Sequence, residues 1–550
     1  MIPASHTPSS APPPRDLSPN KQDPTNTVEG SHVDVEIDYF TINVFFDGTW
    51  NNMFNNNLYR LESKDYDTKV KVDGGTSYHR EATGVEWLYK GYKKPEGDDK
   101  NIAVYVEGTG TFNGEKDSNL SAATGYGPTM GQRAKLERAF LLINEELKKK
   151  KLTSAKFDVV KLNVYGFSRG AACARWFSNV ARSEPERIKF DDPLTKTKIQ
   201  LGFLGIFDTV SSVGVSHGND TKSYEQKVET DNAVKDKNDQ PIAFKVVHLT
   251  ARNEARTYFS LYNIQSAVSK GYGLELSLPG CHTDIGGGLG VLEKKLGDNV
   301  VVVGRNEELT YVSAHRTADE YGRYATTDAK FGYNSEGKTD KAGWWIFDNA
   351  ITRLLSQLGA KNNVDVRKMA ERMVDFGYFK SFTELTSDSP EVEKNDSGRG
   401  TKKEALYLIT QDSGKHRYQA LKGYRFQLET GYPRVPCNIM LDFAKKYHAD
   451  FFEKFPNNPE SRISAPLTGI YDELKKKAFD LDDQCVAQKK GLIAELKIDE
   501  REKSRWLYNN YLHWSGDGGM MDVQLDPNGV EWRTIYEAKA NTGASDVTVA

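Results

Sequence analysis

The most constraining feature of the sequence is an apolar run, VVKLNVYG, that leads directly into Gly166-Phe167-Ser168-Arg169-Gly170 and then into AACARWF. The run is typical of a buried parallel strand, and the small residues after it favour a closely packed helix. A G-x-S-x-G sequence between a strand and a helix is typical of a nucleophile elbow, a sharp, strained turn that exposes a serine hydroxyl. Glycines on both sides of the serine keep side chains out of the turn. We therefore predict that Ser168 is a nucleophile, and a helix N-cap is the alternative role.

Further apolar runs surround this motif. Strands are expected at residues 42–46, 101–110, 157–166, 199–208 and 274–280, and helices at residues 128–150 and 243–258. Strands that alternate with helices and are almost continuously apolar predict a parallel sheet covered on both faces. The predicted fold class is therefore α/β, with a mostly parallel sheet and an additional, mostly helical region.

Composition limits what the 550-residue chain can bind. Its 74 basic and 77 acidic residues leave a net charge of −3, so we expect no nucleic-acid partner, because duplex binders need a concentrated basic surface. The chain has no stretch of about 18 uninterrupted apolar residues, so we expect no membrane-spanning helix. We also expect no secretory signal peptide, because no basic segment followed by an apolar one opens the chain. The four cysteines lack paired short spacing, which fits folding in a reducing cytosol.

Three regions of the chain differ in character. Residues 1–34 are rich in proline, serine and threonine and are predicted to be a disordered arm. Residues 35–300 hold the strand and helix alternation, interrupted by a charged insertion at about 216–242. Residues 301–550 are predicted to be a mostly helical accessory, lid or membrane- or partner-binding region, and its final helix is a candidate to rejoin the core.

Residues 343–358 within this last region read GWWIFDNAITRLLSQL, with apolar side chains at helical spacing behind Trp344 and Trp345. This pattern predicts an amphipathic helix. A core helix is favoured over one that faces a bilayer or acts as a lid.

A serine nucleophile needs a histidine base and an acid that orients the histidine. After an elbow of this kind the acid and the histidine follow the serine in chain order. Asp208 ends the strand at 199–208, on the same sheet edge as the elbow, although turn capping is a common role for such an aspartate. His282 follows a strand and precedes a glycine-rich segment, so we predict that it is the base. Asp284 is the runner-up acid or a brace for this loop, and His513 is the runner-up base.

Three further candidates are weaker. His248 falls in the predicted helix at 243–258, where a core or surface role is expected. Cys281 occupies no expected helix start, so nothing visible lowers the pKa of its thiol. A second G-x-S-x-G match, at residues 214–218, is predicted to be a loop because no apolar helix follows it.

Acyl transfer also needs backbone N–H donors where negative charge develops. We expect one at Arg169, the residue after the nucleophile, and another in the turn after the first strand, at Gly48 or Thr49. A plain strand-ending turn explains Asp47-Gly48-Thr49 equally well. The same turn is similar to that of haloacid-dehalogenase phosphatases, but Phe45 stands where their nucleophilic aspartate is required.

A metal site is a remaining alternative, although no tight ligand cluster in the sequence supports it. Its ligands would come from Asp47, Glu107, Asp208, His282 and Asp284. A serine, histidine and aspartate triad needs no metal and no organic cofactor, so we expect none.

Five segments, in chain order, carry a family resemblance: VFFDGTWNN, YGFSRGAACAR, GIFDTVSSVG, HLTARNEARTYF and PGCHTDIGGG. They resemble successive blocks of a family of α/β-hydrolases that includes the phospholipase effectors of type VI secretion with a Gly-x-Ser-x-Gly elbow. The matching blocks span residues from about 40 to 290, and YLHWSG near the C-terminus is similar as well.

This resemblance implies a triad of Ser168, Asp208 and His282 and hydrolysis of fatty-acyl esters of glycerophospholipids, with A1 or A2 selectivity open. It implies synthesis in the cytoplasm, delivery by a type VI secretion spike protein into the periplasm of a neighbouring bacterium, and a cognate immunity protein in the producer. Contact with the bilayer would be peripheral. The alternatives are a soluble carboxylesterase of the same fold and a non-enzymatic spike adaptor with a degenerate elbow.

Overall fold

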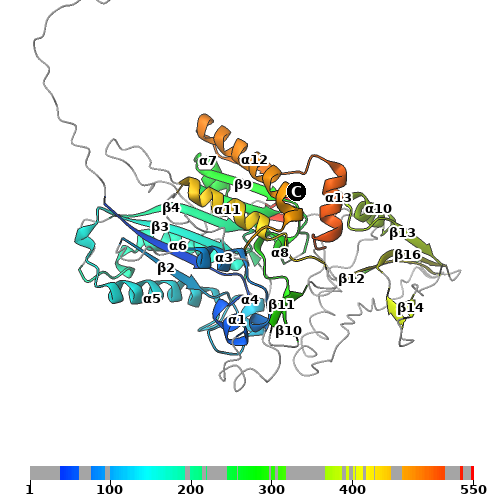
Figure 1. Ribbon diagram of the computed structural model, residues 1–550, viewed down its shortest axis with the longest axis horizontal. Coiled ribbons are helices and arrows are strands. Elements are labelled where there is room, and N and C mark those ends of the chain that lie inside the picture. The colour runs from blue at the N-terminus through cyan, green and yellow to red at the C-terminus, as the bar shows by residue number, and fades with distance from the viewer. Residues whose placement is uncertain are drawn as a thin grey trace, which may run out of the picture. The chain divides into compact units, whose positions relative to one another are not determined.

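Figure 1 shows the chain as a computed structural model. The structure describes residues 38–60, 76–92, 100–192, 198–213, 218–219, 245–256, 258–295, 299–303, 307–316, 366–386, 392–394, 400–402, 404–412, 416–426, 428–447, 461–514, 533–536 and 547–549. The predicted arm at 1–34, almost all of the insertion at 216–242 and the predicted helix at 343–358 lie outside the described residues.

A parallel sheet of seven strands forms the centre of the described residues, in the order β18-β9-β7-β4-β3-β1-β2. The strands are β1 (Tyr39–Phe46), β2 (Asn101–Val106), β3 (Val159–Phe167), β4 (Lys198–Phe207), β7 (Lys245–Ala251), β9 (Gly273–Leu278) and β18 (Leu492–Glu495). All seven run in the same direction, so their carboxyl ends meet at one edge. The predicted α/β fold with a mostly parallel sheet is confirmed.

Helices cover both faces of this sheet (Figure 1). Side chains alternate along β1, so Val44 and Phe46 enter one hydrophobic core while Phe45 enters the other. The first core is closed by α5 (Gln132–Lys150) and α6 (Arg169–Ser183), and the second by α3 (Gly84–Gly91), α11 (Arg434–Tyr447) and α12 (Ala465–Gln488).

Shorter elements connect and flank these layers. In the first part of the chain they are α1 (Met53–Arg60), η1 (Thr76–Tyr78), α4 (Asn119–Thr124), η2 (Ser154–Lys156), η3 (Pro185–Arg187), β5 (Ser212–Val213), β6 (Gly218–Asn219), β8 (Leu261–Tyr262), α7 (Gln265–Ser269), α8 (His282–Gly286), β10 (Val291–Lys295) and β11 (Asn299–Val303). Later in the chain they are β12 (Glu307–Arg316), α10 (Val366–Phe376), β13 (Phe382–Leu385), β14 (Val392–Lys394), β15 (Gly400–Lys402), β16 (Ala405–Asp412), β17 (His416–Arg425), α13 (Arg501–Asn510), β19 (Thr534–Tyr536) and β20 (Val547–Val549).

The predicted helix at 243–258 is wrong, because residues 245–251 form strand β7 between β4 and β9. All seven side chains of β7 are buried. Polar residues such as His248 interrupt the apolar pattern of β7, so that the sequence suggests helical periodicity. Inside the protein the side chain of His248 forms hydrogen bonds.

The region beyond residue 300 also differs from its expected, mostly helical character. Besides helices α10 to α13, it contains a second sheet of four strands in the order β12-β17-β16-β13. The structure does not divide at residue 300, since β18 pairs with β9 at the edge of the main sheet and α11 and α12 close one of its cores. The second core of the sheet is therefore built from both halves of the chain, with α3 and α8 from the first half and α11 and α12 from the second. No helix in the described part of the chain is long and apolar enough to cross a membrane.

Candidate active site

Ser168 stands at the turn between β3 and α6 with φ 58° and ψ −126°, a conformation that a residue with a side chain rarely adopts. Its N–H donates to Phe207 O over 3.0 Å, and its carbonyl accepts the N–H of Ala171 over 3.0 Å. Its side chain makes no capping hydrogen bond, although Ser168 occupies the N-cap position of α6. The hydroxyl is therefore not bound to the helix terminus. This arrangement fits a nucleophile and argues against a helix cap, which would bind the terminal N–H groups.

The two glycines of the motif are required by backbone contacts. A Cβ atom on Gly166 would lie 2.6 Å from Gly170 O, and one on Gly170 would lie 2.3 Å from Asp47 O. Backbone atoms cannot move away as a flexible side chain can. The elbow is therefore tight because β3, α6 and the end of β1 approach each other at their main chains.

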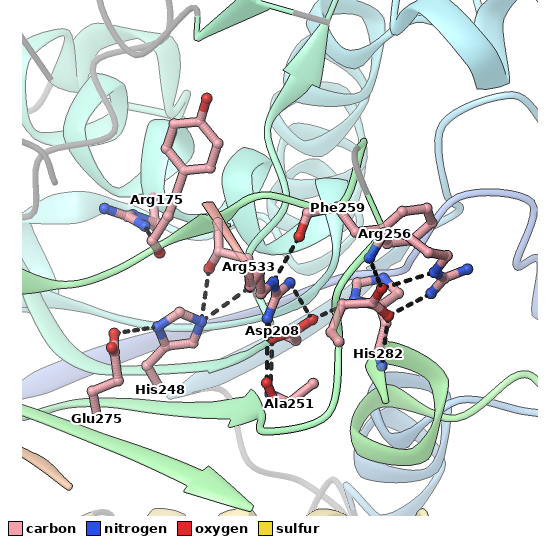
Figure 2. A network of polar contacts seen from close by, with 12 residues as sticks. Arg175, Asp208, His248, Ala251, Arg256, Phe259, Glu275, His282 and Arg533 are labelled. Atoms are coloured by element: carbon pink, nitrogen blue, oxygen red, sulfur yellow. Dashed lines mark hydrogen bonds and ion pairs between the residues drawn. The ribbon is translucent and has the colours of Figure 1, made fainter. Parts of the chain in front are cut away.

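Asp208 directly follows β4, is fully buried and has a φ of 37°. Its Oδ2 accepts the Nδ1–H of His282 over 2.6 Å, and its Oδ1 accepts the backbone N–H of Ala251 over 2.9 Å. Arg533 adds a two-point ion pair, with Nη1 2.7 Å from Oδ1 and Nη2 2.8 Å from Oδ2 (Figure 2). Burial alone would raise the pKa of Asp208, but Arg533 and His282 more than offset it and hold the pKa well below 3.8.

His282 is the first residue of α8, beyond the carboxyl end of β9. Its ring centroid lies 4.6 Å from that of Phe167, the residue before the nucleophile, and 4.9 Å from that of Phe259. Its backbone N–H donates to Glu254 Oε2 over 3.2 Å. These contacts hold the imidazole beside the elbow.

The bond to Asp208 fixes the tautomer of His282, because a proton on Nδ1 leaves the lone pair on Nε2. Burial lowers the pKa of His282 from 6.5, although Asp208 opposes that effect. The imidazole is therefore neutral at neutral pH. Among the described residues, Ser168 Oγ has no hydrogen-bond partner.

The predicted oxyanion donors differ in availability. The N–H of Gly48 donates to Asp47 Oδ1 over 2.7 Å, so this amide is engaged. Among the described residues, the amides of Thr49 and Arg169 find no acceptor, and Arg169 Nε donates to Thr49 Oγ1 over 2.8 Å. This side-chain bond joins the turn after β1 to the start of α6, so the two open amides belong to one linked unit.

The runner-up residues Asp284 and His513 bind each other. His513 Nδ1 is 2.7 Å from Asp284 Oδ1. Asp284 Oδ2 accepts the backbone N–H groups of His513 and Cys281, over 3.0 and 2.9 Å. This carboxylate therefore braces the residue that precedes His282.

The weaker candidates are also placed. His248 is buried in β7, where its Nε2 accepts the N–H of Thr209 over 3.0 Å and its Nδ1 lies 2.8 Å from Glu275 Oε2 (Figure 2). Cys281 does stand at a helix start, the N-cap of α8, contrary to expectation. Burial nevertheless raises the pKa of its thiol well above 9.0, so the sulfur is a poor nucleophile. Residues 214–217 of the second G-x-S-x-G match lie outside the described residues.

The five residues of the metal alternative have separate partners. Asp47 binds Gly48, Thr83 and Tyr105, whereas Glu107 binds Lys135. Asp208 and His282 bind each other, and Asp284 binds His513. Within the ranges that the structure describes, no group of three or more histidine, cysteine or acidic side chains could hold a metal ion.

The sequence reasoning missed Arg533, which lies 325 residues after Asp208. One arginine in the segment EWRTIY carries no signal of the partner that it meets. Only the placement of β19 beside β8 brings the two residues together.

One segment of the chain matches a model of a known protein family. Residues 179–303, which include Asp208 and His282, match the family model described as "T6SS, Phospholipase effector Tle1-like, catalytic domain". No curated protein matches the chain.

Two solved structures were also compared. One is described as the "Structure of the Tle1 effector bound to the VgrG spike from the Type 6 secretion system", with 20% identity, a TM-score of 0.46, and coverage of 89% of this chain and 87% of that one. The other is an uncharacterized protein from Pseudomonas aeruginosa, with 19% identity, a TM-score of 0.29, and coverage of 46% of this chain and 42% of that one. The family match agrees with the resemblance predicted from the motifs, and residues 179–303 are similar to the catalytic domain of Tle1-like phospholipase effectors of the type VI secretion system.

Proposed function

We propose that the protein is a serine phospholipase of the A type in which Ser168, Asp208 and His282 form the catalytic triad. The observation that carries the proposal is the bond of 2.6 Å between His282 Nδ1 and Asp208 Oδ2, at the sheet edge where the Ser168 elbow lies. A neutral imidazole oriented by a buried carboxylate next to a strained serine is the arrangement that acyl transfer requires.

In the proposed mechanism, Ser168 Oγ attacks the ester carbonyl of a glycerophospholipid while His282 Nε2 takes the serine proton. Asp208 keeps the proton on Nδ1 and stabilises the imidazolium that forms. The amides of Arg169 and Thr49 are the candidate donors to the oxyanion, at the positive end of α6. The protonated His282 then gives its proton to the leaving lysophospholipid, and water releases the fatty acid from Ser168.

The test is digestion of a phospholipid that carries a different acyl chain at each position, by wild type and by Ser168→Ala. The wild type should release one acid in excess, which identifies A1 or A2 selectivity, and Ser168→Ala should release none while keeping its fold. Activity of Ser168→Ala equal to that of wild type would overturn the triad. Activity on short-chain soluble esters but none on vesicles would favour the carboxylesterase alternative.

A fluorophosphonate probe separates an enzyme from a non-enzymatic adaptor. Labelling of wild type at Ser168, absent in Ser168→Ala, is expected for a serine hydrolase. An intact, folded protein that takes up no label would favour the adaptor with a degenerate elbow.

We further propose delivery by the type VI secretion spike protein and action in the periplasm of a target bacterium, neutralised in the producer by an immunity protein. The match to a type VI effector family supports this proposal. Expression in a test bacterium with a periplasmic export signal should be toxic, whereas Ser168→Ala in the periplasm should not be. Equal toxicity of the two proteins would contradict a phospholipase basis for the killing.

A further inference from the structure

Arg533 reaches the proposed catalytic acid from a segment far along the chain. It immediately precedes β19, which pairs in parallel with β8, so that Ile535 lies beside Leu261. The N–H of Asn263 donates to Tyr536 O over 3.1 Å, and the rings of Tyr262 and Tyr536 stack with centroids 5.1 Å apart. The backbone that carries Arg533 is therefore fixed to β8.

β8 is in turn fixed to the loop that holds Asp208. The N–H of Tyr262 donates to Thr209 O over 3.0 Å, and Val210 forms an antiparallel bridge with Leu261. From the other side, the buried guanidinium of Arg175 donates to the carbonyls of Tyr262 and Asn263, over 2.9 and 3.0 Å. One framework thus carries both partners of the ion pair between Arg533 and Asp208.

The guanidinium of Arg533 is buried and hydrogen-bonded through all three of its nitrogens. Its side chain is only 6% exposed, and its Nε donates to Phe259 O over 2.7 Å while its two terminal nitrogens bind Asp208. With Ala251 N–H on Oδ1 and His282 on Oδ2, each oxygen of Asp208 accepts two hydrogen bonds (Figure 2). A carboxylate held at four points has one available orientation, the one that presents Oδ2 to His282.

We infer that Arg533 is a positioning residue for catalysis, which fixes the orientation of the Asp208 carboxylate and balances its charge so that His282 stays a neutral base. The inference rests on the proposed function, because it assigns a role within the same triad. It also makes the segment of Arg533 and strand β19 a part of the active site, although this segment lies far beyond the matched catalytic-domain segment at 179–303.

The charges around His282 set the direction of the expected effect. Asp208 and Glu254 favour its protonated form, and Arg256 opposes protonation. Arg533 contacts Asp208 directly. Burial raises the pKa of Glu254, but Arg256 and, to a smaller extent, Arg533 lower it. Without Arg533, two carboxylates would face His282 against one cation. The imidazole would then hold its proton more tightly, and the base would become available only at higher pH.

The test compares Arg533→Met, Arg533→Lys and Arg175→Met in the full-length protein. Arg175→Met is the matched control, since it also removes a buried guanidinium that binds β8 but has no bond to the triad. For each variant we would measure kcat and KM on a dispersed short-chain phosphatidylcholine between about pH 5 and 9, fluorophosphonate labelling, and the melting temperature.

Arg533→Met should lower kcat by about 100-fold with little change in KM, because the acid and the base lose their alignment. The acid limb of kcat/KM, which is the pH range where activity falls as His282 becomes protonated, should move up by roughly one pH unit. Arg533→Lys keeps the charge but makes a single-point contact, so it should lower kcat and leave the limb in place. Arg175→Met should lower the melting temperature and leave the limb in place.

Wild-type kcat and an unmoved limb in Arg533→Met would overturn the inference. A second result would also overturn it. If kcat falls in Arg533→Met and in Arg175→Met in proportion to the fall in melting temperature, and the acid limb of kcat/KM does not move, Arg533 is a structural residue. If Arg533→Met does not fold, Arg533→Lys decides, and an unchanged kcat in that variant rejects the inference. Failure of the triad itself would be seen separately, as full activity of Ser168→Ala.

Discussion

His513 and Asp284 are bound to each other, with His513 Nδ1 2.7 Å from Asp284 Oδ1, and Asp284 is the third residue of the helix that begins at His282. Asp284 also accepts the backbone N–H of Cys281 over 2.9 Å. The described residues thus contain two bound pairs of histidine and aspartate, and His282 of the pair with Asp208 contacts Phe167 of the Ser168 elbow. We expect the second pair to support the first through the backbone of α8.

Replacing each histidine by glutamine should separate the two pairs. His282→Gln removes the proposed base and should lower kcat by at least about 10⁴-fold without unfolding the protein. His513→Gln breaks a buried hydrogen bond and should destabilise the fold by about 1–3 kcal/mol, with kcat within about tenfold of wild type. Phospholipid turnover and thermal unfolding measure the two effects. A complete loss of turnover in a folded His513→Gln protein would reverse the assignment of the base.

The pH dependence of catalysis should reflect the lowered pKa of His282. Its pKa lies below 6.5, chiefly because burial disfavours the imidazolium. The neutral base is then present throughout the neutral range, and kcat/KM should fall only as the pH falls through a value below 6.5. A pH series on a soluble phospholipid analogue provides the check. An acid limb above pH 6.5 in the wild-type enzyme would contradict a buried, neutral imidazole.

A methyl group on Gly170 should disrupt the elbow. The new Cβ would lie 2.3 Å from Asp47 O and 2.4 Å from Phe46 O, so α6 would have to move away from β1. Gly170→Ala should cost about 1–3 kcal/mol of unfolding free energy and most of the activity. Gly469→Ala in α12 is the control, since its Cβ would meet only the end of Lys503, at 3.8 Å. That change should be neutral or stabilising by up to about 1 kcal/mol. Equal effects of the two substitutions in denaturant titration would argue against a tight elbow.

Asp47 should make the protein less stable as the pH rises. Burial raises the pKa of Asp47 from 3.8 to about 7, so between these values the folded state binds more protons than the unfolded chain. The free energy of unfolding therefore falls with rising pH across that window. Asp47→Asn should gain stability relative to wild type as the pH increases from about 4 to 8.

An exposed carboxylate provides the control for this effect. Asp480 on α12 is 54% exposed and pairs with Lys476, so Asp480→Asn should stay within about 0.5 kcal/mol of wild type at each pH. Denaturant unfolding at several pH values measures both variants. A constant difference between Asp47→Asn and wild type across the range would show that Asp47 keeps its ordinary pKa.

Local sequence was sufficient for the parts of the site that depend on neighbouring residues. The Ser168 elbow needs an apolar strand, two glycines and a helix of small residues, and all of these lie within one continuous segment. Asp208 and His282 were recognisable because each follows an apolar strand, and parallel strands end at the same edge. The family resemblance rested on the same short segments.

Local sequence misled where burial outweighed pattern. Residues 245–251 contain polar side chains that suggest a helix, yet they form a central strand because His248 and its neighbours find partners inside the protein. The sheet of β12, β13, β16 and β17 was missed for a different reason, since β12 pairs with β17, a strand far along the chain whose partner no local pattern indicates.

The sequence by itself determined the strained serine turn, the parallel fold and the order of the proposed catalytic residues along the chain. Tertiary structure alone decided which side chains meet across hundreds of residues: Arg533 with Asp208, His513 with Asp284, and β18 with β9. The physical reason is the range of the interactions. A tight turn is specified by the conformations allowed to adjacent residues, whereas an ion pair or a strand pairing depends on where the packed core places two distant segments.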